Sequence, residues 1–278
     1  MMLVTGASGQ LGTAFRKHLG DRAQYVDLPE LDLTDAKAIR ETIRDLEPKT
    51  VINCAAYTAV DRAETEEDAA FAVNATATET MAAACADVGA RFVTYSTDYV
   101  FDGTKLDPYV ESDTTSPINA YGRTKLAGEE AALAANPGSL VIRTSWLMSG
   151  THRNFASVML DLIGKGDVTV VADQRGRATF VDDLVSGSCD ALDSGVTGVL
   201  HMANAGATTW YEIARMIAEF AGLDPGRVSP CTTADYPTAA ARPQNSVLDS
   251  ERIEVLGLSE LPSFRAALER AVYELQSS

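Results

Sequence analysis

A glycine-rich turn near the N-terminus limits what the chain can fold into more than any other feature. The β-branched run Met2–Thr5 leads directly into GASGQLG at residues 6–12, after which a helical pattern begins. Glycines in such a turn let the backbone bend tightly and approach a pyrophosphate, while the first amides of the following helix attract negative charge. The G-x-x-G-x-x-G spacing is wider than the usual dinucleotide fingerprint, so its strand–turn–helix context carries the prediction. The turn therefore predicts a dinucleotide-binding α/β fold.

The first half of the chain alternates short β-branched runs with longer helical patterns. Strands separated by helices cannot pair as hairpins, so they predict parallel crossovers and a Rossmann-like, doubly wound α/β sheet. The expected strands are Met2–Thr5, Gln24–Val26, Thr50–Asn53, Arg91–Tyr95 and Leu140–Ile142, and the expected helices are Leu11–Leu19, Ala36–Leu46, Glu66–Val88 and Tyr121–Ala135.

From Trp146 onward the alternation is less regular, and loops rich in Pro, Gly and Thr separate the elements, notably Leu223–Pro243. Residues 1–145 are predicted to form the dinucleotide-binding domain. Residues 146–278 are predicted to form mainly a smaller C-terminal substrate lobe, with about residues 168–190 returning to the sheet. The expected strands here are Val168–Val171 and Val199–Met202, and the expected helices are Trp210–Ala221 and Ser263–Leu275.

Charge and cysteine usage narrow the class of protein further. The chain carries 39 acidic and 23 basic residues, a formal net charge of −16, which disfavours nucleic acid and anionic membranes as partners. Its 4 cysteines include no C-x-x-C pair, which favours free thiols in a reducing compartment over a zinc site or a disulfide framework. We see no signal peptide and no apolar run near the ~18–20 residues of a membrane helix, so a cytoplasmic location is expected.

Asp27 is the main sequence clue to which nicotinamide cofactor binds. It ends the second predicted strand, 21 residues after Gly6, where an acid can bond the adenosine ribose hydroxyls and favour NADH. Arg16 and Lys17 in the first helix would tolerate a 2′-phosphate, so NADPH and NADH both stay open.

Further cofactor contacts are expected where predicted strands end. Asp32 and Leu33 follow the next short extended segment and are expected beside the adenine, and NCAAY at residues 53–57 ends a strand. Its alanines suit a backbone pressed against the cofactor and equally suit plain packing. The predicted cofactor-binding residues are Gly6, Ser8, Gly9, Gln10, Leu11, Asp27, Asp32, Leu33, Ala55, Ala56, Tyr57, Tyr95, Tyr121 and Lys125.

Tyr121 and Lys125 stand four apart, on one face of a predicted helix. A free tyrosine titrates near ~10. A nearby ammonium, together with the positive nicotinamide of an oxidised cofactor, is expected to lower the Tyr121 pKa toward the working range. Thr97, directly after the fourth predicted strand, is placed to bond a substrate carbonyl beside the phenol. The pair alone could be an exposed helix contact, so the hydroxyl is what points to a catalytic set of Tyr121, Lys125 and Thr97.

These elements resemble the extended short-chain dehydrogenase/reductase superfamily, and more closely the dTDP-4-dehydrorhamnose reductase family. The likeness covers nearly the whole chain, and its later motifs are more specific than the glycine loop. The motifs are STDYVFDG at 96–103, YGRTKLAGE at 121–129, RTSW at 143–146, Asn154-Phe155, Asp173-Gln174, Trp210-Tyr211-Glu212 and RPQNS at 242–246.

The resemblance implies NAD(P)H-dependent reduction of the C4 ketone of dTDP-6-deoxy-L-lyxo-4-hexulose to dTDP-L-rhamnose, by a monomer or homodimer. Tyr121 would donate the proton, Lys125 would be its electrostatic partner and Thr97 the substrate-binding hydroxyl. The substrate-binding residues would be Thr97, Asp98, Trp146, Asn154 and Arg242.

Two departures from the family pattern and two alternatives remain. Ala178 stands where the family usually has Pro before the threonine at 179, which loosens that loop, and the first helix lacks the acid that bridges a metal in some members. No metal is therefore expected. The Asp-Glu pair of the 4,6-dehydratases is absent after Thr97, since Asp98 is followed by tyrosine. The alternatives are a reductase of a related nucleotide 4-keto-6-deoxy sugar and a non-catalytic, NADP-binding regulatory subunit of the same family.

Overall fold

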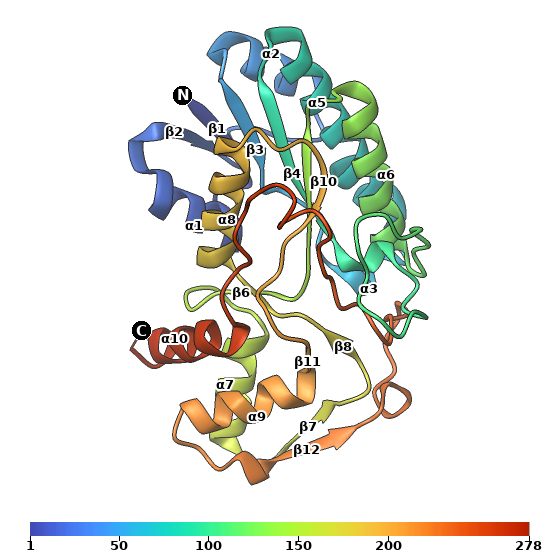
Figure 1. The fold of residues 1–278 in the computed structure, drawn as a ribbon, viewed down its shortest axis with the longest axis vertical. Helices are drawn as coiled ribbons and strands as arrows, with labels where there is room; N and C mark the ends of the chain where they lie inside the picture. The colour runs from blue at the N-terminus through green and yellow to red at the C-terminus, as the bar shows by residue number, and fades with distance from the viewer. Residues whose placement is uncertain (278) are drawn as a thin grey trace.

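Six parallel strands form the central sheet of the computed structural model, which describes residues 1–277 (Figure 1). Their order across the sheet is β10-β5-β4-β3-β1-β2, so the chain reverses its winding direction between β1 and β3. In doubly wound sheets, ligands bind at the carboxyl ends of the strands beside such a reversal. The strands are β1 Met2–Thr5, β2 Ala23–Val26, β3 Thr50–Asn53, β4 Arg91–Thr97, β5 Leu140–Thr144 and β10 Gly198–His201. The predicted doubly wound α/β class is confirmed.

Helices cover both faces of the sheet (Figure 1). On one face lie α1 (Gln10–Leu19) and α8 (Val181–Asp193), and on the other α2 (Ala36–Leu46), α5 (Ala77–Val88) and α6 (Ala120–Ala135). Because both faces are covered, the middle strands are buried along their whole length, as β-branched runs in parallel sheets are.

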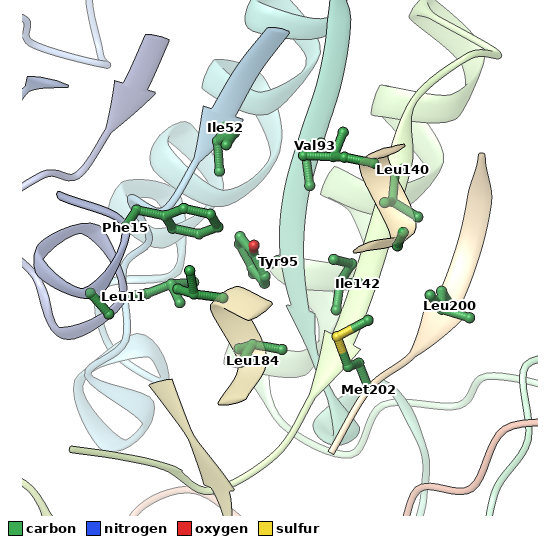
Figure 2. Packing of buried hydrophobic residues seen from close by; sticks show 14 of the residues in the cluster. Leu11, Phe15, Ile52, Val93, Tyr95, Leu140, Ile142, Leu184, Leu200 and Met202 are labelled. Atoms are coloured by element: carbon green, nitrogen blue, oxygen red, sulfur yellow. The ribbon is translucent and has the colours of Figure 1, made fainter. Parts of the chain in front are cut away.

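The core between the sheet and α1 and α8 contains one polar aromatic side chain. Figure 2 shows Phe15 of α1 pointing toward Tyr95 of β4, with Leu184 of α8 nearby. The two rings lie 6.2 Å apart, and the Tyr95 hydroxyl donates to Ser188 Oγ at 2.9 Å. Ring packing and one hydrogen bond therefore fix Tyr95 near the carboxyl end of β4, where it lines the cleft described below.

The predicted helix Glu66–Val88 is interrupted in the structure. It divides into α4 (Glu67–Phe71), a π-turn η2 (Ala72–Thr76) and α5. Asn74 in the turn accepts the Tyr57 amide at 2.8 Å and donates to Thr124 Oγ1 of α6 at 3.1 Å. Single π-turns inside helices occur frequently at functional sites, and this one ties the loop after β3 to α6.

The smaller lobe contains α7 (Phe155–Lys165), α9 (Trp210–Phe220) and α10 (Phe264–Ser277), which pack on one another below the sheet (Figure 1). Its paired strands are β7 Val168–Val171 with β12 Val228–Cys231, β6 Leu147–Met148 with β9 Thr179–Phe180, and β8 Arg175–Gly176 with β11 Thr208–Thr209. The remaining helices are α3 Val60–Ala63 and the 3₁₀ turns Gly20–Arg22, Asp98–Val100, Pro225–Arg227 and Thr233–Asp235.

The prediction that residues 168–190 return to the sheet needs correction. β7 pairs with β12 in the lobe, and the segment that returns consists of α8 and β10. The partner strand was missed because β12 lies inside the Pro-rich stretch 223–243, which was interpreted as a loop. The division of the chain at residues 145 and 146 stays a prediction.

We expect Gly128→Ala to destabilise the protein. A Cβ at Gly128 would lie 2.1 Å from the Asn74 carbonyl oxygen, so α6 and η2 would have to separate. Overpacking of this kind lowers the free energy of unfolding by about 1–3 kcal/mol, measured by urea denaturation. The control is Gly164→Ala in α7, where a Cβ meets nothing within 4 Å and where helix propensity should raise stability by up to ~1 kcal/mol. Equal effects of the two substitutions would contradict the close approach of α6.

Candidate active site

The carboxyl ends of the sheet strands border a cleft of about 920 Å³. That volume is within the range of small-molecule and cofactor sites. Most of the predicted site residues line this cleft, although they come from segments far apart in the sequence. They are Gly6, Gly9, Gln10, Leu11, Asp27, Asp32, Leu33, Ala55, Ala56, Tyr57, Tyr95, Thr97, Asp98, Tyr121, Lys125 and Trp146.

The glycine turn forms one end of the cleft. Gly6 has a φ of +65°, and a Cβ there would lie 2.5 Å from the Ala55 amide nitrogen, so only glycine fits. A Cβ at Gly12 would lie 2.2 Å from the Gly6 carbonyl oxygen. Gly9 caps α1 without any side-chain hydrogen bond, which leaves the first-turn amides of the helix, at Gln10 and Leu11, with no capping partner. Amides of this kind at a helix N-terminus suit a phosphate group.

Asp27 lies in the wall of the cleft at the end of β2. Its carboxylate accepts the Ser8 amide at 2.7 Å and the Leu28 amide at 2.9 Å, which fixes the side chain beside the glycine turn. Arg16 and Lys17, the two cations that could bind a 2′-phosphate, contact other side chains outside the cleft lining. Arg16 lies over the Tyr25 ring at 4.4 Å and Lys17 pairs with Asp182 at 3.0 Å, both outside the cleft lining.

A close helix approach positions Tyr121. Asn119 caps α6 by accepting the Gly122 amide at 2.7 Å, and a Cβ at Gly122 would lie 2.1 Å from the Tyr99 carbonyl oxygen. The first turn of α6 therefore rests against the 3₁₀ turn Asp98–Val100 that follows β4. The rings of Tyr99 and Tyr121 meet edge to face with centroids 6.0 Å apart, and Tyr121 shares a hydrogen bond with Thr97.

The Tyr121 phenol is protonated at neutral pH in this structure. Burial raises its pKa to about 12, the charge on Asp98 adds to that effect, and the hydrogen bond with Thr97 opposes it. Lys125 is not among the groups that shift the Tyr121 pKa in the protein alone. The lowering expected from Lys125 together with an oxidised cofactor stays a prediction. Lys125 is itself only 5% exposed, and burial lowers its pKa to about 8.

Asp98 is a buried carboxyl group beside the phenol, and it is 2% exposed. Its Oδ1 accepts the Thr97 hydroxyl at 3.0 Å, while its Oδ2 is buried without a hydrogen-bond partner among the described residues. Burial raises the Asp98 pKa to about 7, against hydrogen bonds from Ser246 and Thr97 that lower it. A polar ligand in the cleft would satisfy the free oxygen.

Trp146 lies at the opposite wall in a strained backbone conformation, with a φ of +47°. Its ring stacks on Trp210 with centroids 3.9 Å apart, and a Cβ at Gly176 would lie 2.6 Å from it. Trp210 was not singled out from the sequence as a site residue. It fixes the orientation of Trp146, and only the fold brings the two tryptophans together.

Three predicted site residues, Ser8, Asn154 and Arg242, do not line the cleft. Asn154 caps α7, accepting the Ala156 amide at 2.9 Å. Arg242 forms two hydrogen bonds to the Asp61 carboxylate, at 2.5 and 2.8 Å. The described structure thus gives Asn154 and Arg242 partners within the protein, and their contact with substrate stays a prediction.

Several other residues line the cleft that were not predicted from the sequence. Ser96, Thr144 and Ser145 are hydroxyl residues at the carboxyl ends of buried strands. Thr97 was predicted from that same position, so these three residues could have been predicted in the same way. His152 and Arg153 lie between β6 and α7, and no local pattern shows that this segment folds back to the cleft. Within residues 1–277 there is no group of three or more metal-ligating side chains, and no described helix is long and apolar enough to cross a membrane.

Comparisons with known proteins agree with this geometry. The family model described as "RmlD substrate binding domain" matches residues 1–277. A dTDP-4-dehydrorhamnose reductase of Mycolicibacterium smegmatis is 42% identical over 98% of this chain and 84% of its own length. A probable dTDP-4,6-dihydroxy-2-methyloxan-3-one 4-ketoreductase of Streptomyces antibioticus is 42% identical over 97% of this chain and 93% of its own. The structure of Bacillus anthracis dTDP-4-dehydrorhamnose reductase in complex with NADP superimposes with a TM-score of 0.95 at 35% identity, covering 98% of both chains.

We expect the Asp98 carboxyl group to titrate near pH 7. Because burial disfavours the charged form, the group should be protonated below that pH and ionised above it. Infrared difference spectra of the ligand-free protein between pH 5 and 8 measure the protonated carboxyl band, and the Asp98→Asn spectrum assigns it. Asp102→Asn is the control, since hydrogen bonds lower the Asp102 pKa. If the protonated-carboxyl band of Asp98 has already disappeared at pH 5, the prediction that burial raises the Asp98 pKa is wrong.

Proposed function

The chain belongs to the RmlD substrate binding domain family, and from that premise we propose that it reduces the C4 ketone of dTDP-6-deoxy-L-lyxo-4-hexulose to give dTDP-L-rhamnose. The protein is a nicotinamide-dependent reductase of a dTDP-sugar ketone. The observation that carries the specific proposal is that the Tyr121 phenol and the Thr97 hydroxyl line the same cleft as the glycine turn.

The donors at the glycine turn fit a dinucleotide. The first amides of α1 would hold a phosphate group, and the fixed Asp27 carboxylate would accept from a ribose hydroxyl. When bound, NAD(P)H would supply a hydride to the substrate carbonyl carbon. The cofactor residues proposed for this end of the cleft include Gly9, Gln10 and Leu11.

The chain's own residues would complete the reduction on the carbonyl oxygen. With substrate bound, Thr97 would turn its hydroxyl proton from Asp98 Oδ1 to that oxygen and orient the ketone, and Tyr121 would transfer its phenolic proton to the alkoxide. The ammonium of Lys125 then stabilises the tyrosinate that remains. Asp98 and Trp146 line the same cleft and would contact the sugar, with Asp98 Oδ2 accepting a hydroxyl of the substrate.

A second candidate substrate is a nucleotide sugar with a differently substituted 4-ketone. The Streptomyces antibioticus relative, equally similar at 42% identity, carries the name of a 4-ketoreductase for such a sugar. Reduction of the same class with a different hexose is therefore the runner-up. Comparing kcat/KM for the two keto sugars decides between them.

We expect Tyr121→Phe to abolish most of the turnover. A positioned proton donor contributes about 10²–10⁴-fold to the rate, so kcat should fall by that factor while the ring still packs against Tyr99. The assay follows oxidation of NADPH at saturating keto sugar. Tyr273→Phe is the matched control, because that phenol is 73% exposed on α10, and its kcat should equal that of the wild type.

Two further variants separate the roles within the catalytic set. Lys125→Met should lower kcat and also weaken NADPH binding, while Thr97→Val should reduce the rate more modestly, through one lost hydrogen bond to the ketone. Folding and cofactor binding are checked by circular dichroism and fluorescence titration. If Tyr121→Phe leaves turnover within a few-fold of wild type in a folded protein, the regulatory-subunit hypothesis becomes the better one.

We expect the protein to accept NADH as well as NADPH. The Asp27 carboxylate is fixed beside the ribose position, and both candidate cations for a 2′-phosphate are engaged outside the cleft. The ratio of kcat/KM values should therefore stay well under 100-fold in favour of NADPH. A preference of ~100-fold or more, about 2.7 kcal/mol, would show that another cation reads the 2′-phosphate.

A further inference from the structure

A buried ion pair lies one helical turn beyond Lys125. Both oxygens of the Glu129 carboxylate accept from the Arg143 guanidinium, at 2.6 to 3.1 Å, and the two side chains are only 3% and 5% exposed. Glu129 comes from α6 and Arg143 from β5, so the pair joins the helix that carries Tyr121 to the strand that leads into Trp146.

The pair is held in place from behind. Arg143 Nη1 lies 3.3 Å from His201 Nε2, and the guanidinium carbon lies 5.2 Å above the Phe101 ring. His201 Nδ1 lies 2.8 Å from the Asp249 carbonyl oxygen, to which it donates, so Nε2 accepts from Arg143. Burial lowers the His201 pKa, which keeps this ring neutral. The guanidinium therefore has fixed partners and cannot turn away from Glu129.

Stability alone does not explain such a pair. The free energy needed to remove two charges from water can exceed the attraction that a buried ion pair gains. Apolar residues of similar volume therefore often stabilise a protein as well or better. On α6, Tyr121, Lys125 and Glu129 recur every four residues and share one face. Glu129 is the charged group that raises the pKa of Lys125, against the burial that lowers it.

We propose that Glu129 and Arg143 are a positioning pair for the reaction: Arg143 holds the Glu129 carboxylate in place, and that carboxylate supports the positive charge of Lys125 on the same face of α6. Its catalytic consequence rests on the proposed function, because the charge on Lys125 matters for stabilising the tyrosinate. Neither Glu129 nor Arg143 lines the cleft, so the pair acts through Lys125.

No other described group replaces Glu129 in this role. The π-turn η2 and α5, which pack on α6, bury only uncharged side chains there. At the start of α6, Glu64 accepts the Ala120 amide and Glu67 pairs with Arg123, away from Lys125. The other titratable groups on the elements packed around α6 include Tyr121 on α6 itself, Tyr95 on β4, Asp98 and Tyr99 in the turn after β4, Glu111 in the loop before α6 and His201 on β10.

The test measures the pKa of Lys125 directly, in protein without substrate or cofactor. The chain has six lysines, so carbon-13 labelling at the lysine ε-carbon gives few signals in a two-dimensional NMR spectrum, and Lys125→Met identifies the one from Lys125. In Glu129→Gln the titration midpoint of Lys125 should fall by about 1 pH unit or more relative to wild type. Glu129→Asp, which keeps the charge, should return the midpoint toward the wild-type value.

Glu130→Gln is the matched control, since it removes the same charge one residue further along an exposed part of α6. Its midpoint should stay within a few tenths of a pH unit of the wild type. Equal midpoints in Glu129→Gln and Glu130→Gln would overturn the proposal, because general charge or a purely structural role would then explain the pair.

Glu129→Gln leaves Arg143 buried without its partner, so a second variant covers the case that it does not fold. Glu129→Gln combined with Arg143→Gln removes both charges and should still lower the Lys125 midpoint, and an unchanged midpoint again overturns the proposal. The alkaline limb of kcat/KM is then compared with the NMR midpoints. If the midpoint moves while the limb stays, Glu129 does set the charge of Lys125 and the proposed role of Lys125 in the reaction is what fails.

Discussion

A short ladder of buried hydrogen bonds crosses the carboxyl ends of β1, β3 and β4, and the site depends on it. Thr5 donates to the Asn53 side chain at 2.8 Å, and Asn53 donates to Thr94 at 3.3 Å. The Asn53 oxygen also accepts the Ala55 amide at 3.1 Å, which turns the chain at the end of β3 toward Gly6. Because these groups are buried, a shift of one strand would leave polar atoms unpaired, so the ladder fixes the strand ends that form the cleft floor.

Close backbone contact then places α6 relative to that floor. Gly122 packs against the carbonyl of Tyr99 and Gly128 against that of Asn74, so neighbouring backbone holds α6 beside Tyr121 and just beyond Lys125. Tyr121 and Lys125 lie four residues apart on one face of the helix, next to these two contacts. The position of Tyr121 and Lys125 is therefore set by two glycines that themselves carry no functional group.

The sequence predicts the repeating elements well, because burial on both faces leaves a strong local pattern. The bounds of β1, β3, α2 and β7 agree with the prediction, and the glycine turn, Asp27 and Tyr121 lie around one cleft. What it did not predict depends on partners distant in the chain. Nothing local identifies β12 as the partner of β7, and nothing near Arg242 shows that it pairs with Asp61. The π-turn at Asn74 was missed because its hydrogen bonds go to Tyr57 and Thr124.

Burial shifts the three titratable groups of the site in the same chemical sense, toward their neutral forms. It raises the pKa of Tyr121 and of Asp98 and lowers that of Lys125. For the proposed reduction this direction is the useful one, since a tyrosine that protonates the alkoxide must hold its proton beforehand. The same burial works against the Lys125 ammonium, which in the proposed reaction stabilises the tyrosinate. The Glu129 carboxylate, held by Arg143 outside the cleft lining, raises the pKa of the lysine without placing a negative charge in the cleft. In the proposed reaction it would therefore support the ammonium and would not repel the phosphates of an anionic substrate.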